Sequence, residues 1–464
     1  MTYLLVRSVA VTLVCGVAIA LSAQQPPATP PPSGQSDVSL VIRNGGDPSL
    51  PPKLAVPSFI ALTNDAETQA AAKIVGDVIW DDLEFEKEYY MVPRDTYRSI
   101  PQPASLDQVP LDRWKELNAD AVLIGSVAKT PKGVLVSMRL INVASGASAM
   151  AREYSGSATS IQVNPVRAFA HTIADEVHKE QRGLNGIART KIAFSSDRDG
   201  ERIRGPVGDR GISNIYMADY DGARQQRVTI SKSLDISPVW SPDGRSIAFS
   251  SWRTNFQDIY VLYPYGGPEL QNPTKGNAAK QNYLPAWSPD GSKLAFTSNR
   301  DGNAEIYVMN RDGSGVQRLT NHPNIDVTPT WSPTGTQLAF TSDRSGTPQI
   351  YIVNADGTQL QQITRESYCD RPTWSPAPLN EIAYSARSGG GNIIKVFDFA
   401  TRSTRALTDN IGNNESPAFS PNGRHIAFVS SRAGKEQIFT IHRDGSGLRQ
   451  ITRTGTNRYP HWSK

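Results

Sequence analysis

One pentapeptide returns along the second half of the chain at a nearly constant interval, and this repeat restricts the fold more than any other feature. Its first copy is Trp240-Ser241-Pro242-Asp243-Gly244. Later copies, complete or partial, start at Trp287, Trp331, Trp374, Phe419 and Trp462. The intervals are 47, 44, 43, 45 and 43 residues. A period of this size indicates a single supersecondary unit that is repeated several times.

Each unit contains four short segments with the composition of β-strands. Strand a ends at the anchor tryptophan and has a proline two residues before it; strand b is an apolar run such as Ile247-Ala248-Phe249. Strand c contains an Ile-aromatic pair such as Ile259-Tyr260, and strand d is a short run such as Arg318-Leu319-Thr320. Ser-Pro-Asp-Gly suits a type I turn, and Asp-Gly suits a tight hairpin. Four strands repeated at this period are typical of the blades of a β-propeller.

The order of the strands predicts how the ring closes. The first unit begins at strand b, with Ile192-Ala193-Phe194, and has no strand a before it. The last unit is followed by an additional strand a, Tyr459 to Trp462. We therefore expect the C-terminal strand to complete the first blade, which gives six blades and leaves no unpaired blade edge.

The N-terminus has the features of an export signal and a linker. Arg7 precedes an apolar run from Val9 to Leu21, which is too short to span a bilayer comfortably. We predict a signal peptide at residues 1–23, with the mature chain starting between Leu21 and Gln24; an uncleaved anchor is the alternative. Residues 24–37 are rich in proline and form an extended linker. After cleavage Cys369 is the only cysteine, so the mature chain has no internal disulfide. An exported chain without disulfides fits a bacterial periplasm.

Residues 38–185 are expected to form a separate α/β (α+β) domain, and residues 186–464 the propeller. Periodicity predicts helices at 66–83 and 111–118 and a third helix that starts at 164. It predicts strands at 54–56, 89–92, 121–127, 134–142 and 149–154, the last three forming an antiparallel run.

The residues show no sign of catalysis, of a metal site or of a cofactor site. A formal charge of +4 on 464 residues, without a basic run, indicates no nucleic-acid partner and no membrane patch. There is no Gly-x-Ser-x-Gly motif, and the six histidines have no ligand-like spacing. We expect no catalytic residue, no metal, no cofactor and no membrane insertion after signal removal, and we expect a monomer.

Two sets of polar residues recur with the repeat and are predicted to share one face of the propeller. The first set stands five residues before the anchors and would surround one mouth of the channel: Asp235, Asn282, Asp326, Asn414 and Asn457, with Cys369 in the remaining unit. The second set follows strand b or precedes strand a: Arg198, Arg253, Arg300, Arg344, Arg432, Arg371 and Arg458. The first set could recognise a partner or weakly hold a cation through its oxygen ligands, and the second set could attract an acidic partner. Alternatively, the acids and amides cap turns, and each arginine ties its loop to a neighbouring blade.

The whole mature chain resembles the TolB family of periplasmic propeller proteins of the Tol-Pal system. The resemblance includes Val38 to Ile42, Leu54 to Phe59, Asn118 to Gly125 and the six blade motifs. The proline-rich stretch before the first strand is a departure from the family pattern. The resemblance implies a scaffold that binds the lipoprotein Pal through the propeller and TolA through the N-terminal segment, for envelope integrity and cell division.

Together, the resemblance and the geometry predict a binding site for Pal at the mouth of the channel. The residues expected there are Asp235, Asn282, Asp326, Asn414, Asn457, Arg253, Arg300, Arg371 and Arg458. The alternative is a propeller enzyme, a lyase or hydrolase that acts in the central channel.

Overall fold

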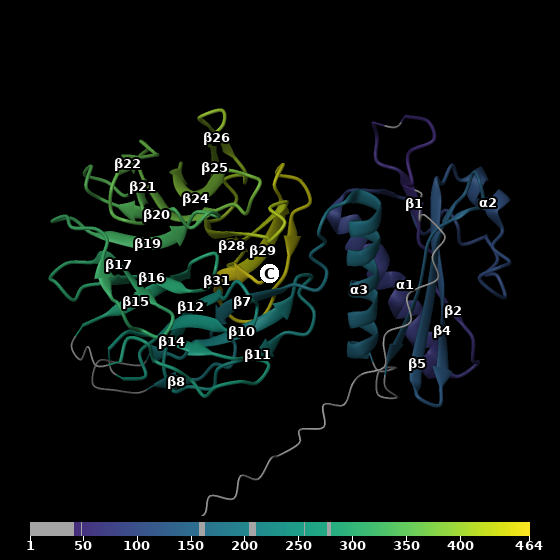
Figure 1. The fold of residues 1–464 in the computed structure, drawn as a ribbon, viewed down its shortest axis with the longest axis horizontal. Helices are drawn as coiled ribbons and strands as arrows, with labels where there is room; N and C mark the ends of the chain where they lie inside the picture. Colours follow the sequence, from purple (N-terminus) through teal and green to yellow (C-terminus); the bar gives the residue numbers. More distant parts are fainter. Residues whose placement is uncertain (1–40, 48, 157–162, 204–209, 255, 276–279) are drawn as a thin grey trace, which may run out of the picture. The chain divides into compact units, whose positions relative to one another are not determined.

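The chain folds into an α/β domain followed by a six-bladed β-propeller (Figure 1). The computed structural model describes residues 41–464 except 48, 157–162, 204–209, 255 and 276–279. The signal peptide predicted at residues 1–23 and the linker predicted at residues 24–37 lie outside the described residues. Among the described residues, no helix combines the length and the apolar character needed to cross a bilayer.

The α/β domain contains one mixed sheet and three helices. Its strands are β1 (Lys53–Ala55), β2 (Ile60–Ala61), β3 (Tyr90–Met91), β4 (Ala121–Thr130), β5 (Gly133–Asn142) and β6 (Ser148–Gly156). Its helices are α1 (Ala66–Glu86), α2 (Leu111–Glu116) and α3 (Val163–Arg182). Strands β4, β5 and β6 are antiparallel, as predicted, whereas β1 pairs in parallel with β3 and β4. Figure 1 shows α1 and α3 side by side, and their apolar residues share one core with β4 and β5.

Five of the six blades contain the four strands that the repeat predicted, whereas blade 2 has three strands and, in place of strand d, an isolated bridge between Val261 and Gln271. Blade 1 contains β7 (Lys191–Ser196), β10 (Asn214–Asp219), β11 (Gln226–Arg227) and β31 (Asn457–Trp462), and carries the hairpin β8 (Arg202–Ile203) and β9 (Arg210–Gly211). Blade 2 contains β12 (Asp235–Trp240), β13 (Ile247–Ser251) and β14 (Asp258–Leu262). Blade 3 contains β15 (Asn282–Trp287), β16 (Lys293–Ser298), β17 (Glu305–Asn310) and β18 (Gln317–Arg318). Blade 4 contains β19 (Asp326–Trp331), β20 (Gln337–Ser342), β21 (Gln349–Asn354) and β22 (Gln361–Gln362). Blade 5 contains β23 (Cys369–Trp374), β24 (Glu381–Ser388), β25 (Gly391–Asp398) and β26 (Ser403–Ala406). Blade 6 contains β27 (Asn414–Phe419), β28 (His425–Ala433), β29 (Lys435–His442) and β30 (Arg449–Gln450).

The C-terminal strand closes the ring, as predicted from the order of the strands. β31 pairs antiparallel with β7, and Trp462 stands opposite Ile192. The Trp462 indole is buried, and its Nε1–H donates to Thr190 Oγ1 at 2.6 Å. The first and last segments of the propeller therefore stabilise each other.

Every innermost strand contains a bulge at the residue before its proline. This residue has a positive φ of 54–56° in all six blades, at Ser237, Leu284, Thr328, Arg371, Ser416 and Tyr459. The register of each strand against strand b shifts at the same point. A bulge of this kind bends the strand and changes the direction of its side chains. The sequence did not predict it, because a residue before proline ordinarily prefers an extended backbone.

Residues 40–464 form one compact unit, in which helix α1 contacts blade 6 through a buried polar cluster. Arg424 of blade 6 donates to Glu86 Oε2 at 2.7 Å and to Glu88 Oε1 at 2.8 Å. Its guanidinium also lies 2.5 Å from His178 Nε2. Beside this cluster, His425 stacks on Phe85 with the ring centroids 4.2 Å apart, and its Nε2 lies 3.0 Å from the Phe85 carbonyl oxygen. The contact between the two domains therefore includes buried or half-buried ionisable side chains, among them Glu86, Arg424 and His425.

We expect His425 to make the protein less stable in acid. Burial, aided by the nearby His442, lowers the pKa of His425 from 6.5 to about 3. At pH 5 His425 is therefore neutral in the folded chain but protonated in the unfolded chain, so its contribution to the free energy of unfolding decreases as the pH falls below 6.5. At pH 5 this one group should remove about 2 kcal/mol.

The substitution His425→Gln tests this expectation, since its side-chain amide can still donate to the Phe85 carbonyl but does not titrate. Urea unfolding at pH 7 and pH 5 should show a smaller loss of stability for the variant than for the wild type, by about 2 kcal/mol. Equal losses in the two proteins would contradict the assignment.

Candidate functional site

The candidate site is the loop face of the propeller, the face that carries the d–a and b–c loops. Strands a and b are antiparallel, so the start of each strand a lies beside the end of strand b. In blade 2, for example, Asp235 at the start of β12 stands opposite Ser251 at the end of β13. The two sets of polar residues predicted from the sequence therefore lie on the same face.

An arginine joins these two strand ends in blade 2. Arg253 donates from Nε to Ser251 Oγ at 2.9 Å and from Nη2 to Asp235 Oδ2 at 2.9 Å. Its guanidinium carbon lies 4.6 Å from the ring centroid of Tyr260. We call this arrangement, in which an arginine stacks on an aromatic ring and bonds a serine and an acid or amide, the arginine clamp.

Four other blades contain the same clamp. The distances from arginine Nη2 to the acid or amide oxygen are 2.8 Å for Arg198–Asn457, 2.8 Å for Arg300–Asn282, 2.6 Å for Arg344–Asp326 and 3.2 Å for Arg432–Asn414. In blades 2, 3, 4 and 6 the two partners are 18 residues apart in the sequence. This constant spacing is the signal from which the pairing could have been predicted.

The clamps show what holds the loop face together. The five acids and amides are buried, and the arginines Arg253 and Arg300 are half-buried. Each clamp lies within a single blade, so the clamps do not make the expected ties to neighbouring blades. That expectation holds for Arg458 of blade 1, which pairs with Glu436 of blade 6. The clamped side chains support the loops of this face, and their contact with a partner stays a prediction.

Blade 5 has a different arrangement, because Cys369 replaces the acid or amide. The Cys369 side chain is fully buried, and burial raises the pKa of its thiol to about 12. In this blade Arg387 lies over Tyr368, with its guanidinium carbon 5.7 Å from the ring centroid. A buried thiol with a raised pKa is unreactive.

Arg371 and Arg458 lie in innermost strands and not in d–a loops, where the sequence placed them. The bulge turns Arg371 toward the channel, where its guanidinium carbon lies 4.6 Å from the ring centroid of Tyr459. Arg458 is 53% exposed and pairs with Glu436. Of the predicted arginines, Arg458 is therefore the most accessible.

The central channel has a narrow part and a wide part. The narrow part has a volume of about 110 Å³ and is lined by residues of the six bulges, including Arg371 and Tyr459. The wide part has a volume of about 530 Å³ and extends to the Ser-Pro turns on the opposite face. Its described lining contains only two titratable side chains, His461 and Lys464. Burial lowers the pKa of His461 to about 4, and its Nδ1 accepts the Trp240 backbone N–H at 3.1 Å.

Large apolar side chains are exposed on the loop face, and the sequence analysis did not select them. Ile230, Phe256, Ile325 and Ile411 are 88%, 40%, 43% and 59% exposed, and all lie in d–a or b–c loops. Each lies within five residues of a clamped acid, amide or arginine in the sequence, and this proximity is the signal that could have identified them. Exposed apolar residues beside charged ones are typical of protein interaction surfaces.

The described residues contain no group of three or more His, Cys, Asp or Glu side chains close enough to hold a metal ion. His171 is buried, and its Nδ1 lies 2.8 Å from Asp82 Oδ2.

Comparison with known proteins identifies the same two domains. The family model described as the TolB beta propeller domain matches residues 180–464, and that of the TolB amino-terminal domain matches residues 38–149. A Tol-Pal system protein TolB from Desulfosudis oleivorans is 32% identical over 212 residues, 45% of each chain. One from Histophilus somni (strain 129Pt) is 31% identical over 229 residues, 49% of each chain. The match thus spans about half the length of these curated relatives. The crystal structure of TolB from Acinetobacter baumannii is similar with a TM-score of 0.73 and 26% identity, covering 89% of this chain and 96% of that chain.

Proposed function

Because the chain belongs to the TolB β-propeller family, we propose that it is a non-enzymatic scaffold of the Tol-Pal envelope system. In this proposal it binds the lipoprotein Pal through the loop face of the propeller and TolA through its N-terminal segment. It acts as a monomer in the periplasm and contributes to envelope integrity and cell division. The relatives' role in the Tol-Pal system supports the first part of the proposal.

We assign the protein partner to the loop face. The arginine clamps hold its loops, so binding would require little ordering of the backbone. Ile230, Phe256, Ile325 and Ile411 supply exposed apolar area, and Arg458 supplies an accessible charge. An apolar surface with a charged rim is typical of protein interfaces. The exposed isoleucines are the single observation on which this assignment depends most.

The alternative function, a lyase or hydrolase in the channel, has less support. A catalytic channel needs an acid, a base or a metal ligand close to the substrate. In the part of the channel that the structure describes, prolines, tryptophans and small residues form most of the wall, and His461 accepts a backbone hydrogen bond.

We expect Ile411→Asp and Arg458→Glu to weaken the binding of Pal by about tenfold each. Ile411→Asp removes exposed apolar area from the loop face, whereas Arg458→Glu reverses a rim charge and should mainly lower the association rate. Surface plasmon resonance with immobilised Pal measures both effects.

Two matched variants on the opposite face serve as controls. Leu360→Asp alters an apolar residue that is 46% exposed, and Asp444→Lys reverses a charge that is 61% exposed on its side chain. Both should bind Pal like the wild type. If these controls weaken binding while the loop-face variants do not, the assigned face is wrong.

A further inference from the structure

A pocket between blades 3 and 4 interrupts a structural pattern that three other blades follow. In blades 2, 3 and 5 a residue of the turn between strands c and d packs on the tryptophan that ends strand a. We call the residue of this turn the cover residue; the six are Tyr220, Tyr265, Arg311, Ala355, Phe399 and Arg443. Four of them donate the same backbone hydrogen bond to the turn between strands a and b of their own blade: Arg311 to Ser292, Ala355 to Thr336, Phe399 to Asn380 and Arg443 to Arg424. The position of Ala355 is therefore structurally equivalent to the others.

In blades 2, 3 and 5 the cover residue lies over the anchor tryptophan of its own blade. Tyr265 stacks on Trp240, with centroids 6.1 Å apart, and Phe399 stacks on Trp374, with centroids 5.3 Å apart. The guanidinium carbon of Arg311 lies 5.1 Å from the Trp287 ring centroid. In blade 4 the cover residue is Ala355, whose methyl group is too short to fill this space.

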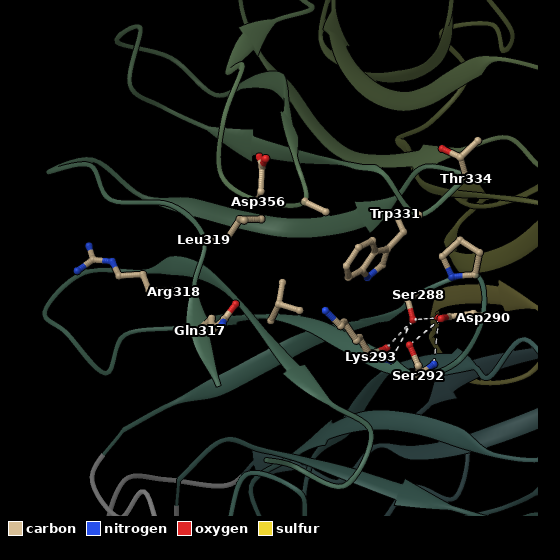
Figure 2. Close-up of a pocket in the computed structure, with 14 residues that line it drawn as sticks. Ser288, Asp290, Ser292, Lys293, Gln317, Arg318, Leu319, Trp331, Thr334 and Asp356 are labelled. Carbon is tan, nitrogen blue, oxygen red and sulfur yellow. Dashed lines mark hydrogen bonds between the residues drawn. The ribbon is translucent and has the colours of Figure 1, made fainter. Parts of the chain in front are cut away.

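A pocket of about 380 Å³ occupies the corresponding place beside Trp331. Its lining includes Trp331, Ala355, Leu319 and Val308 as apolar walls, with Lys293 below the indole ring (Figure 2). A cavity of about 150 Å³ is sufficient for a benzene ring. The pocket therefore has room for an aromatic ring with a short substituent.

Lys293 determines which substituent fits. In Figure 2 its ammonium points toward the space beside Trp331, while Arg318 points away from it. The Lys293 ammonium has no hydrogen-bond or ion-pair partner among the described residues, whereas Arg318 pairs with Glu305 at 3.0 Å. The two carboxylates at the rim are engaged in their own turns: Asp290 accepts from Ser288 and Ser292, and Asp356 from Thr358.

In other blades the residue equivalent to Lys293 has a polar partner. Lys293 is the first residue of β16, and the equivalent residues of blades 2 and 5 are Ser246 and Glu381. The cover residues that face these two are arginines: Arg311 lies 3.4 Å from Ser246, and Arg443 lies 2.7 Å from Glu381. In blade 1 the equivalent residue is Lys191, which pairs with Asp219 of its own blade. Lys293 has no such partner among the described residues.

From this pattern we propose that the pocket beside Trp331 binds a small aromatic carboxylate. The ring would stack on Trp331 in the space left by Ala355, and the carboxylate would accept hydrogen bonds from Lys293. The site lies on the face opposite the loop face and is independent of the proposed binding of Pal.

The proposal is tested by measuring the binding of 3-(4-hydroxyphenyl)propanoate to the full chain with saturation-transfer NMR. The wild type should bind this probe at millimolar concentration. Ala355→Phe supplies the missing cover ring and should abolish binding, while raising the melting temperature. Lys293→Gln should weaken the carboxylate probe about tenfold and leave the neutral analogue 4-ethylphenol unaffected.

Arg311→Ala is the matched control, because it opens the equivalent space over Trp287, where Ser246 replaces the lysine. It should gain no carboxylate binding. The proposal is overturned if the wild type does not bind the probe, or if Lys293→Gln binds it as tightly as the wild type. It is also overturned if a folded Ala355→Phe variant still binds the probe. If Ala355→Phe does not fold, the Lys293→Gln variant decides whether the proposal holds, because it should bind the carboxylate probe more weakly than the wild type does and 4-ethylphenol equally well.

Discussion

A chain that ends at Arg458 should be less stable than the full chain by at least about 3–5 kcal/mol, the usual cost of losing one buried tryptophan side chain. Trp462 is buried against the core and donates to Thr190. The truncation also removes the pairing of His461 and Trp462 with β7 and exposes the edge of that strand. Thermal and urea unfolding of the truncated chain measure the loss.

The matched control is a chain that ends at Ser463. It lacks only the exposed Lys464, so its stability should stay within about 0.5 kcal/mol of the full chain. Ser463 remains to accept the Lys191 backbone N–H at 2.8 Å. An unchanged melting temperature in the chain that ends at Arg458 would mean that β31 does not close the ring.

The substitution Arg424→Ala should destabilise the protein by about 3–5 kcal/mol at pH 8, because it leaves a buried carboxylate without its partner. The side chains of Arg424 and Glu86 are 16% and 6% exposed, and the pair is 2.7 Å apart. Adding Glu86→Gln removes the unpaired charge and should restore at least half of the lost stability. Urea unfolding of the single and double variants measures both effects.

The pH gives a second test of the same contact. Burial raises the pKa of Glu86 to about 7, even beside Arg424. Below that pH the Glu86 carboxyl can take up a proton, so Arg424→Ala should cost less at pH 5.5 than at pH 8. The exposed pair Arg113–Glu116 is the control, with side chains 61% and 63% exposed; Arg113→Ala should cost less than about 1 kcal/mol at either pH. An equally small cost for Arg424→Ala at pH 8 would show that the contact does not depend on this ion pair.

Most of the propeller could be predicted from the sequence because its strands are local and repeated. Runs such as Ile426-Ala427-Phe428 are fully buried, as their composition indicated. The order of the strands predicted the pairing of β31 with β7. In the α/β domain the periodicity also identified α1 and the antiparallel strands β4, β5 and β6.

The contacts of the loop face were less predictable, since they join residues from different strands. The sequence located the acids, amides and arginines on one face, but their burial follows from the clamps that they form with serines such as Ser251 and Ser298. The sequence offered no comparable signal for the contact of Arg424 with Glu86 and Glu88, because these residues lie in different domains.

By itself, then, the sequence determined the number of blades, most of the strands within them and the closure of the ring, because hydrophobic period and turn chemistry are local properties. Only the tertiary structure decided the positive φ of residues such as Arg371 and Tyr459, against the extended backbone that a following proline favours. It also decided that the side chain of Ala355 leaves a pocket beside Trp331. In both cases the physical reason is the same: the packing of six blades around one axis outweighs local preference and determines which side chains meet.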